Sequence, residues 1–276
     1  MNHEKRIITL EGALNVRELG GLPLKNGRCV KYKKLIRSGR LSNLSEQDKT
    51  SLCDDWNVST IVDLRNEQEI SEHPDIDLKG AVIKKICLLS GEKKAISRED
   101  YGLSISMFAI NRAKSLLEDG GSRHLLESMY SQMAQNEECI QRIREFFELL
   151  LVQNEGALVW HCTSGKDRTG VLGVLLLILL GADLETAKED YLYTNIQNQA
   201  YREDLLERMR NRGAEYDVVE EMRILESVDW TYIAGFLRSI EKCYGSVDLF
   251  LTNEIGMDNE KRRKLLDMYT EVCEEN

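Results

Sequence analysis

The sequence predicts an α/β fold with a central, mostly parallel sheet flanked by helices, and three observations indicate it. Short apolar segments such as 60–64 and 157–162 alternate with helical patterns, as in parallel sheets covered on both faces. The chain of 276 residues is 42% hydrophobic, which suffices for one large core. A polar loop, HCTSGKDRTG at 161–170, joins one of these segments to the apolar run 171–180, and the carboxyl end of a strand is where such sheets place their ligands.

The first part of the chain predicts loops, strands and a short helix. Residues 12–27 are dense in glycine and turn residues, and 29–36 could form an irregular strand. Ser45 begins the stretch SEQD, a plausible N-cap followed by an acidic first turn. The β-branched segment 60–64 predicts a buried strand, and 81–89 is a second candidate.

The rest of the chain is mainly helical in pattern. The helical pattern of residues 101–151 is interrupted at Asp119-Gly120-Gly121. This segment would form either a lid over a site or an ordinary packing layer of helices. We expect one domain, 1–276, with 101–151 as a helical insertion and a helical C-terminal part at 218–276. A third strand is predicted at 157–162, and helices are predicted at 169–180, 184–199 and 218–272.

Charge and cysteine content argue against several classes of protein. A net charge of −10 disfavours nucleic acid and anionic membranes as bulk partners, because the summed field repels polyanions. The seven cysteines are scattered, odd in number and lack a CxxC pair, which indicates reduced thiols and no zinc cage. The start of the chain has no signal-peptide core and 171–180 is too short to span a bilayer, so we expect a cytoplasmic protein; export without a signal peptide would leave no mark here.

The polar loop has the composition of an anion site built around a nucleophile. Its backbone N–H groups can turn inward as a nest, and the helix that follows points the positive end of its dipole at the same place. Both effects stabilise a thiolate, so Cys162 should have a depressed pKa. The planar fork of Arg168 can hold two phosphoryl oxygens. The predicted phosphate-binding residues are Thr163, Ser164, Gly165, Lys166, Asp167, Arg168 and Thr169.

Further features of this loop support the same interpretation. Gly165 permits backbone geometry that a side chain would oppose, and Gly170 lets the helix start pack closely. Thr169 could donate its hydroxyl to the sulfur of Cys162. None of the other six cysteines has an arginine at the same spacing. The alternative, an inert buried cysteine beside a surface arginine, leaves the other matching residues unexplained.

The segment HCTSGKDRTG resembles the active-site loop of cysteine-dependent phosphatases. With NVRELGGL (15–22), LIRSGRL (35–41) and TIVDLR (60–65), the chain is similar to bacterial protein tyrosine phosphatases of the type secreted by mycobacteria as virulence factors, and to related lipid phosphatases. The resemblance implies a cysteine-phosphatase-like fold and a two-step hydrolysis through a phosphocysteine, without metal or other cofactor. It also implies phosphotyrosine as substrate, with phosphoserine, phosphothreonine and phosphoinositides as further ones.

A general acid must protonate the leaving oxygen, and the sequence offers two candidates. No proline follows Pro74, so the separate Trp-Pro-Asp type of loop is missing in recognisable form. Asp167 lies inside the catalytic loop and is favoured by the resemblance; alternatively it would stabilise the loop. Asp63 ends a strand and could face the same site; alternatively it would pair with Arg65 or Arg17, and a carboxylate held by an arginine is a poor acid.

Several basic residues have two interpretations each. Lys166 either faces the pocket mouth, as in phosphatases that accept phosphoinositides, or is a solvated surface lysine. His161 is expected to order the loop through hydrogen bonds more than to transfer protons. One or two arginines of the matched segments should brace the site and the others be structural: Arg17, Arg37, Arg40 and Arg65.

Two other functions compete with hydrolysis. A phosphate-recognising module without turnover would use the same loop, although Cys162, Arg168 and Thr169 are all intact. Rhodanese-like or arsenate-reducing chemistry also places a cysteine in an anion loop, but reductases need a resolving cysteine and none lies close to Cys162 in the sequence. The expected partner is a phosphorylated protein or a phosphoinositide, and oligomeric state leaves no signal that we can read.

Overall fold

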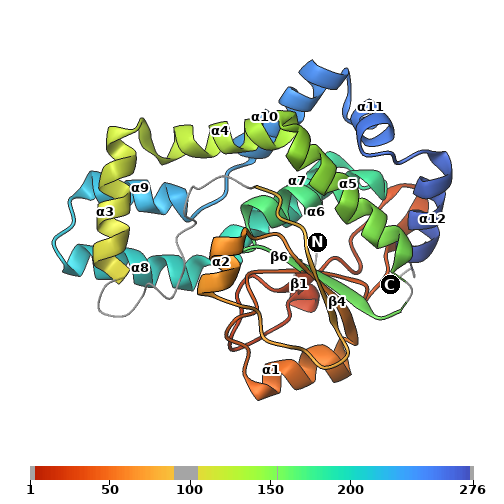
Figure 1. Cartoon of the computed structure of the whole chain (residues 1–276), viewed down its shortest axis with the longest axis horizontal. Helices are drawn as coiled ribbons and strands as arrows, with labels where there is room; N and C mark the ends of the chain where they lie inside the picture. The colour runs from red at the N-terminus through yellow and green to blue at the C-terminus, as the bar shows by residue number, and fades with distance from the viewer. Residues whose placement is uncertain (1–3, 90–104, 154, 274–276) are drawn as a thin grey trace.

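The structure is a computed structural model of the chain, and it describes residues 4–89, 105–153 and 155–273 (Figure 1). The strands are β1 Arg17–Glu18, β2 Arg28–Val30, β3 Leu35–Ser38, β4 Val58–Asp63, β5 Val82–Lys85, β6 Ala157–His161 and β7 Thr270–Val272. The helices are α1 Glu46–Thr50, α2 Glu67–Glu72, α3 Ile105–Glu118, α4 Gly121–Gln135, α5 Glu137–Val152, α6 Asp167–Leu179, α7 Leu184–Gln197, α8 Gln199–Asn211, α9 Tyr216–Leu225, α10 Trp230–Tyr244, α11 Val247–Leu249 and α12 Asn259–Tyr269. Short 3-10 or π turns occupy Glu4–Arg6, Lys25–Gly27, Ser51–Asp55 and Phe250–Glu254.

The main sheet has the strand order β1-β3-β6-β4-β5. The pairs β3–β6, β6–β4 and β4–β5 are parallel, and only β1 runs antiparallel to its neighbour. The predicted α/β fold with a mostly parallel sheet is therefore confirmed. Because β6 is the middle strand, the loop that follows it emerges at the centre of the sheet, flanked by the ends of β3 and β4.

The two faces of the sheet are covered unequally. Leu158 and Trp160 of β6 point into the large core formed with α4–α7 and α10, whereas Val159 points into a smaller cluster beneath α1. This alternation follows from the two-residue period of a strand. Figure 1 shows the helices α4, α5, α6, α7 and α10 on one side of the sheet and α1 on the other.

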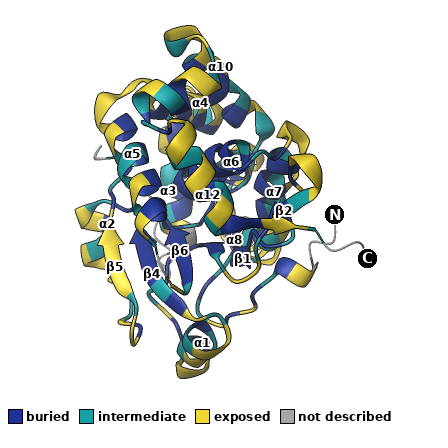
Figure 2. Ribbon diagram, turned by 90° about the vertical axis from the view of Figure 1, so that its right-hand side faces the viewer, coloured by how far each residue is buried: buried dark blue, intermediate teal, exposed yellow. Residues whose placement is uncertain are grey.

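Helix α6 lies in the middle of the large core (Figure 2). All of its residues except Asp167 and Ile178 are buried, which explains why its sequence is apolar around the whole circumference and not along one stripe. Among the residues that the structure describes, no helix is long and apolar enough to cross a bilayer. The sequence interpretation of 171–180 as a buried helix is confirmed.

The helical segment after residue 104 divides between two cores. The expected break at Asp119-Gly120-Gly121 is present, with both glycines at positive φ. Helices α4 and α5 contribute to the main core, whereas α3 packs with α8 and α9 around a separate apolar cluster. Residues 101–104 of the expected insertion lie outside the described residues. Figure 1 shows α3, α8 and α9 together on its left-hand side.

Two expectations about secondary structure are wrong. The single strand expected at 29–36 is two strands in different sheets, separated by a turn in which Lys33 has a φ of 56°. The C-terminal part is not wholly helical, because β7 pairs antiparallel with β2, and Val30 lies opposite Thr270. Strand pairing between segments 240 residues apart leaves no local pattern, so a single sequence does not reveal it.

Candidate active site

The loop that joins β6 to α6 begins with Cys162, whose side chain is buried. Gly165 has a φ of 67°, and a Cβ atom there would lie 2.4 Å from the carbonyl oxygen of Ser38. The predicted need for glycine is confirmed, because the loop turns tightly against the end of β3. Gly170 also lies in close contact, since its Cβ would meet the ring of Tyr191 at 2.8 Å.

The surroundings of Cys162 favour the thiolate. Burial by itself would raise the pKa of this thiol, but the positive charge of Arg168 and hydrogen bonds from the hydroxyl and amide of Thr169 outweigh it. The pKa of Cys162 is therefore below the value of an ordinary thiol. A lowered pKa makes the sulfur a nucleophile near neutral pH.

Arg168 is held in place by a residue that the sequence analysis missed, Glu69 of α2. Its two terminal nitrogens donate to the two carboxylate oxygens of Glu69, Nη1 to Oε2 at 2.7 Å and Nη2 to Oε1 at 2.6 Å. Thr163 donates its hydroxyl to the same carboxylate. Since both Arg168 and Thr163 belong to the loop, Glu69 fixes the loop at two points.

Glu69 also has a role in its own helix. It occupies the third position of α2, where its side chain accepts from the N–H of Asn66 at 3.0 Å while the Asn66 side chain accepts from the Glu69 N–H. Burial opposes its charge, but Arg168 and the hydrogen bonds lower the pKa of Glu69 to about 2. The capping-box pattern N-x-x-E was the one sequence signal that could have drawn attention to this residue.

Asp167, the favoured acid, is the first residue of α6 and remains partly accessible, with 17% of its side chain exposed. One oxygen, Oδ1, accepts the hydroxyl of Tyr130 at 2.9 Å. The other, Oδ2, lies 3.4 Å from the ammonium of Lys166. Tyr130 comes from α4 and did not figure among the sequence candidates.

Lys166 is not a solvated surface lysine, because its side chain is only 7% exposed. Its ammonium donates to the backbone carbonyl of Leu225, the last residue of α9. The loop is thereby connected to the helical cluster of α3, α8 and α9. A cation at the C-terminal end of a helix also complements the helix dipole.

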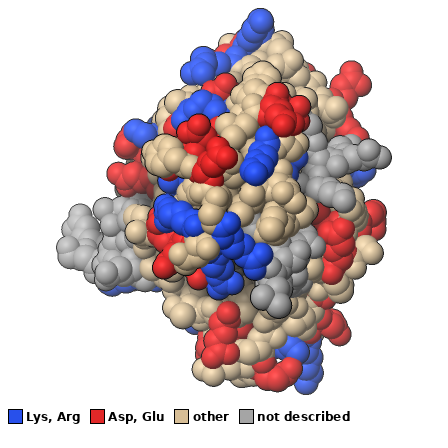
Figure 3. All heavy atoms as spheres, turned by 90° about the vertical axis from the view of Figure 1, so that its left-hand side faces the viewer, with Lys and Arg blue, Asp and Glu red and all other residues tan. Residues whose placement is uncertain are grey.

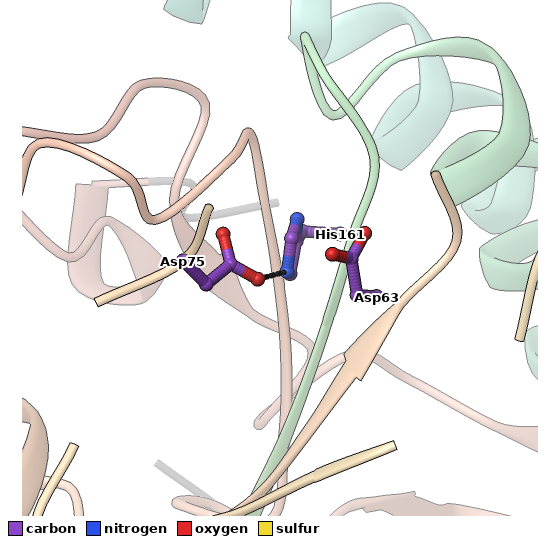
Figure 4. A group of neighbouring side chains, drawn as sticks. All are labelled: Asp63, Asp75 and His161. Atoms are coloured by element: carbon purple, nitrogen blue, oxygen red, sulfur yellow. Dashed lines mark ion pairs between the residues drawn. The ribbon is translucent and has the colours of Figure 1, made fainter. Parts of the chain in front are cut away.

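Asp63, the alternative acid, lies beside Asp75 and His161 (Figure 4) and is bound by an arginine, as one interpretation of the sequence anticipated. Arg65 donates from Nε and Nη2 to the two carboxylate oxygens of Asp63, at 2.9 and 2.8 Å. The same guanidinium contacts Asp75 at 2.8 Å, and the second oxygen of Asp75 lies 2.8 Å from Nε2 of His161. We call these four residues the Arg65 cluster.

His161 connects the Arg65 cluster to Cys162. Its Nδ1 lies 3.2 Å from the carbonyl oxygen of Cys162, and its ring is fully buried. Burial would lower the pKa of His161, but the carboxylate of Asp75 outweighs this effect and raises it. Ligand atoms of Asp63, Asp75 and His161 lie within 4.8 Å of one another. The carboxylates are already engaged by Arg65 and the histidine, so this group serves as an ionic support of the loop more readily than as a metal cage.

A second buried cluster supports the loop from the other side. Asp190 of α7 accepts from Arg6, Arg17 and Arg37 at 3.0, 3.0 and 2.7 Å, and all four side chains are almost fully buried. We call them the Asp190 cluster. Burial opposes the charge of Asp190, but the three arginines hold its pKa far below the usual range.

The Asp190 cluster reaches the loop through Arg37, whose Nη2 donates to the carbonyl of Gly165 at 3.1 Å. Asn15, which accepts from Arg17, donates to the same carbonyl at 2.7 Å. Arg40 contributes a backbone N–H to the carbonyl of Thr163 at 3.1 Å. The matched segments 15–22 and 35–41 are therefore close to the loop in space.

Comparison with known proteins agrees with this geometry. The model of the tyrosine phosphatase family matches residues 8–271. A Cupriavidus necator protein, whose name assigns it provisionally to the tyrosine-protein phosphatases, is 28% identical over 247 residues, 88% of this chain and 82% of that protein. The triple specificity protein phosphatase PtpB of Mycobacterium tuberculosis is 23% identical over 262 residues, 88% of this chain and 91% of PtpB. A tyrosine-protein phosphatase of Nostoc commune is 26% identical over 148 residues, 53% of this chain and 43% of that protein.

Proposed function

Since the chain belongs to the tyrosine phosphatase family, we propose that it hydrolyses phosphotyrosine through a covalent phosphocysteine at Cys162, without a metal ion. The observation that carries the proposal is the placement of Cys162 and Arg168 in one loop between β6 and the start of α6, where the positive charge of Arg168 helps to lower the pKa of the thiol. A thiolate and a guanidinium in one loop provide a nucleophile and an oxygen clamp without further groups. We also infer that the whole chain forms one phosphatase domain.

In the first step, the Cys162 sulfur attacks phosphorus and the bond from phosphorus to the ester oxygen breaks. Arg168 and the loop amides hold the other phosphoryl oxygens, whose charge they stabilise in the transition state. The leaving oxygen takes a proton from Asp167. The bidentate hold of Glu69 on the terminal nitrogens of Arg168 fixes the plane of the guanidinium before the substrate arrives.

In the second step, water attacks the phosphocysteine and the sulfur–phosphorus bond breaks. The carboxylate of Asp167 that remains from the first step takes the proton of the water. The departing thiolate is stabilised by Arg168 and by the hydrogen bonds from Thr169. Inorganic phosphate is released and the starting state is restored.

Two geometric facts favour Asp167 over Asp63 as the acid. Asp167 is partly accessible and lies in the catalytic loop next to Arg168. Asp63 is buried, and both of its carboxylate oxygens accept hydrogen bonds from Arg65. Two charged hydrogen bonds would have to break before Asp63 could reach a substrate. The role of Asp63 is then to orient Arg65 and, through it, Asp75 and His161.

We further propose that phosphoserine, phosphothreonine and phosphoinositides are accepted as secondary substrates. One relative is named a triple specificity phosphatase, which supports a site that tolerates several alcohols. Figure 3 shows a group of Lys and Arg side chains near the centre of the face that carries α3, α8 and α9, although the chain as a whole has a net charge of −10. A local basic surface attracts anionic substrates within about a Debye length of roughly 8 Å at physiological salt.

The test is phosphate release in the presence of EDTA by the wild type and by Cys162→Ser, Asp167→Asn and Asp63→Asn. A phosphotyrosine peptide and a phosphoinositide are assayed in parallel. We expect no activity from Cys162→Ser and a loss of roughly 10²–10⁴ from Asp167→Asn. Asp63→Asn should retain most of the wild-type activity. Because this variant is expected to be less stable, it is assayed well below its melting temperature, where it is folded.

Three outcomes would change the proposal. Loss of activity with EDTA would contradict the metal-free mechanism. A large fall in Asp63→Asn together with an active Asp167→Asn would exchange the two roles. A wild type that binds both substrates yet releases no phosphate would favour a recognition module, and the intact Cys162 would then be a binding residue.

A further inference from the structure

Two buried tyrosine hydroxyls lie next to the catalytic loop and have no part in the mechanism above. Tyr130 of α4 donates to Oδ1 of Asp167 at 2.9 Å, and its oxygen lies 2.7 Å from the hydroxyl of Tyr191 on α7. Both tyrosines are fully buried. Because the proton of Tyr130 is directed to Asp167, Tyr191 must be the donor in the contact between the two hydroxyls.

The rings of both tyrosines are fixed by packing. The ring of Tyr130 packs against that of Tyr232 of α10, with ring centroids 5.6 Å apart. The ring of Tyr191 packs edge to face against Trp230, with ring centroids 6.1 Å apart. The missing side chain of Gly170 leaves the space in which the ring of Tyr191 lies against the first turn of α6. The hydroxyl of Tyr130 therefore has a defined position relative to Asp167, and cannot follow the carboxylate if it rotates.

Both hydroxyls also stay protonated. Burial, followed by the negative charge of Asp167, raises the pKa of Tyr130 and of Tyr191 well above that of an ordinary tyrosine. The pair thus remains a hydrogen-bond donor at neutral pH. It cannot itself serve as the proton donor of the reaction, which leaves a positioning role.

We propose that Tyr130, supported by Tyr191, is a positioning residue that occupies Oδ1 of Asp167 and thereby assigns the proton transfer to Oδ2. This inference rests on the role of Asp167 in the proposed function. Among the residues that the structure describes, the partner of Oδ2 is the more distant Lys166, at 3.4 Å, whose ammonium donates to the Leu225 carbonyl. Oδ2 can therefore carry the proton in the first step and take one from water in the second.

The proposal gives helix α4 a function in catalysis. It reaches the loop from the segment 105–152, which the sequence describes only as helical, and its buried face belongs to the main core. Without the hydroxyl at Oδ1, the carboxyl of Asp167 can rotate about its terminal torsion, since such torsions are broad and roughly two-fold. A proton donor that is oriented only part of the time reduces the rate of the step that needs it.

The experiment compares Tyr130→Phe and Tyr191→Phe with the wild type, using kcat/KM for two substrates. One is a phosphotyrosine peptide, whose leaving phenol needs protonation. The other is p-nitrophenyl phosphate, whose leaving group departs as an anion. We expect Tyr130→Phe to lower kcat/KM for the peptide by about 10-fold to 100-fold, and to affect p-nitrophenyl phosphate by less than about threefold. Tyr191→Phe should show the same selectivity with a smaller loss.

Two further measurements separate positioning from damage to the fold. Tyr130→Phe in the Asp167→Asn background should cause no further loss, because the residue acts only through Asp167. Tyr269→Phe is the matched control: it removes a buried hydroxyl that donates to the Leu150 carbonyl at 2.7 Å, in a residue outside the site, and should leave both substrates unaffected.

The outcomes distinguish this inference from the proposed function. An active Cys162→Ser variant would overturn the phosphocysteine mechanism, and a fully active Asp167→Asn variant would overturn the acid role on which Tyr130 depends. If both of those variants behave as proposed, three results would contradict the positioning role of Tyr130 alone. Tyr130→Phe could lower kcat/KM equally for both substrates, or it could leave kcat/KM unchanged for both. It could also lower the kcat/KM of the Asp167→Asn variant as much as it lowers that of the wild type.

Discussion

Two buried ion clusters support the loop that follows β6, and the ratio of acidic to basic side chains is opposite in the two. In the Asp190 cluster, one carboxylate is shared by three arginines, Arg6, Arg17 and Arg37. In the Arg65 cluster, one guanidinium is shared by Asp63 and Asp75, and His161 completes the group. The first reaches the loop at the carbonyl of Gly165, and the second reaches it at the carbonyl of Cys162.

The two clusters differ in the net charge that they place beside the loop. Three guanidinium charges against one carboxylate leave an excess of two positive charges in the Asp190 cluster. The cost of this excess is visible in Arg17, whose pKa is lowered to about 9 by burial and by the neighbouring Arg37. The Arg65 cluster has no such excess, since its two carboxylates neutralise the guanidinium and, when protonated, the imidazole. The Asp190 cluster therefore carries net positive charge, whereas the Arg65 cluster is close to neutral.

The largest expected effect is obtained by removing the single carboxylate of the Asp190 cluster. Asp190→Asn leaves three buried arginines without a counter-charge, and breaking a buried pair in this way costs about 3–5 kcal/mol. We expect that loss in urea or guanidinium unfolding at pH 7. Glu185→Gln is the control on the same helix, because Glu185 is exposed and pairs with Lys188 only at the surface, where a pair contributes about 0–1 kcal/mol. A similar small loss in both variants would contradict the described cluster.

The second effect concerns a third ion pair at the loop, Glu69 with Arg168, in which one carboxylate faces one guanidinium. The pKa of Glu69 is lowered from 4.5 to about 2, so its contribution to stability is present above pH 4.5 and is lost as the pH falls toward 2. At 1.36 kcal/mol per pKa unit this corresponds to about 3 kcal/mol. We expect Glu69→Gln to remove most of that acid-dependent loss, measured as unfolding free energy from pH 6 to pH 2.5. An unchanged pH dependence would show that other carboxylates carry it.

The loop itself could be predicted from sequence because its signals are local. Cys162, Arg168 and Gly165 lie within seven residues of one another, between a short apolar strand and an apolar helix. Such a pattern fixes both the fold around it and the chemistry it can perform. The Lys166 side chain was harder to place, because its partner, the Leu225 carbonyl, is 59 residues away.

The supporting residues could not be predicted because tertiary packing alone brings them together. Glu69 is 99 residues from Arg168, and Asp190 is 153 residues from Arg37. From the sequence alone, a single carboxylate on a helix is interpreted as a capping or surface residue, because its neighbours in the folded chain are not known. Tyr130 similarly reads as one apolar position of a helical pattern, and only the fold shows that its hydroxyl ends at Asp167.

The third prediction removes one of the two carboxylates of the Arg65 cluster. Asp63→Asn leaves Arg65 with Asp75 as a charged partner, so we expect a smaller loss than in Asp190→Asn, about 1.5–3 kcal/mol for the charged hydrogen bonds. Unfolding in urea measures it directly against the Asp190→Asn variant. If Asp63→Asn lost more unfolding free energy than Asp190→Asn, the number of charged partners left without a counter-charge would not explain the stability of the two variants.

The smallest expected effect concerns His161 and separates the clusters by pH. The pKa of His161 is raised in the folded protein, so its contribution is fully present below the ordinary value of 6.5 and is lost as the pH rises through the higher folded value. The Asp190 cluster changes little in that window, because the pKa of Asp190 lies far below it and that of Arg17, about 9, lies above it. We therefore expect the wild type to lose some stability from about pH 6.5 upward, and His161→Gln to abolish this slope while keeping a donor for Asp75. Unfolding titrations at pH 6, 7 and 8 measure the slope. A slope that persists in His161→Gln would have to come from outside the Arg65 cluster, and the histidine would then be a neutral spacer between Asp75 and the Cys162 carbonyl.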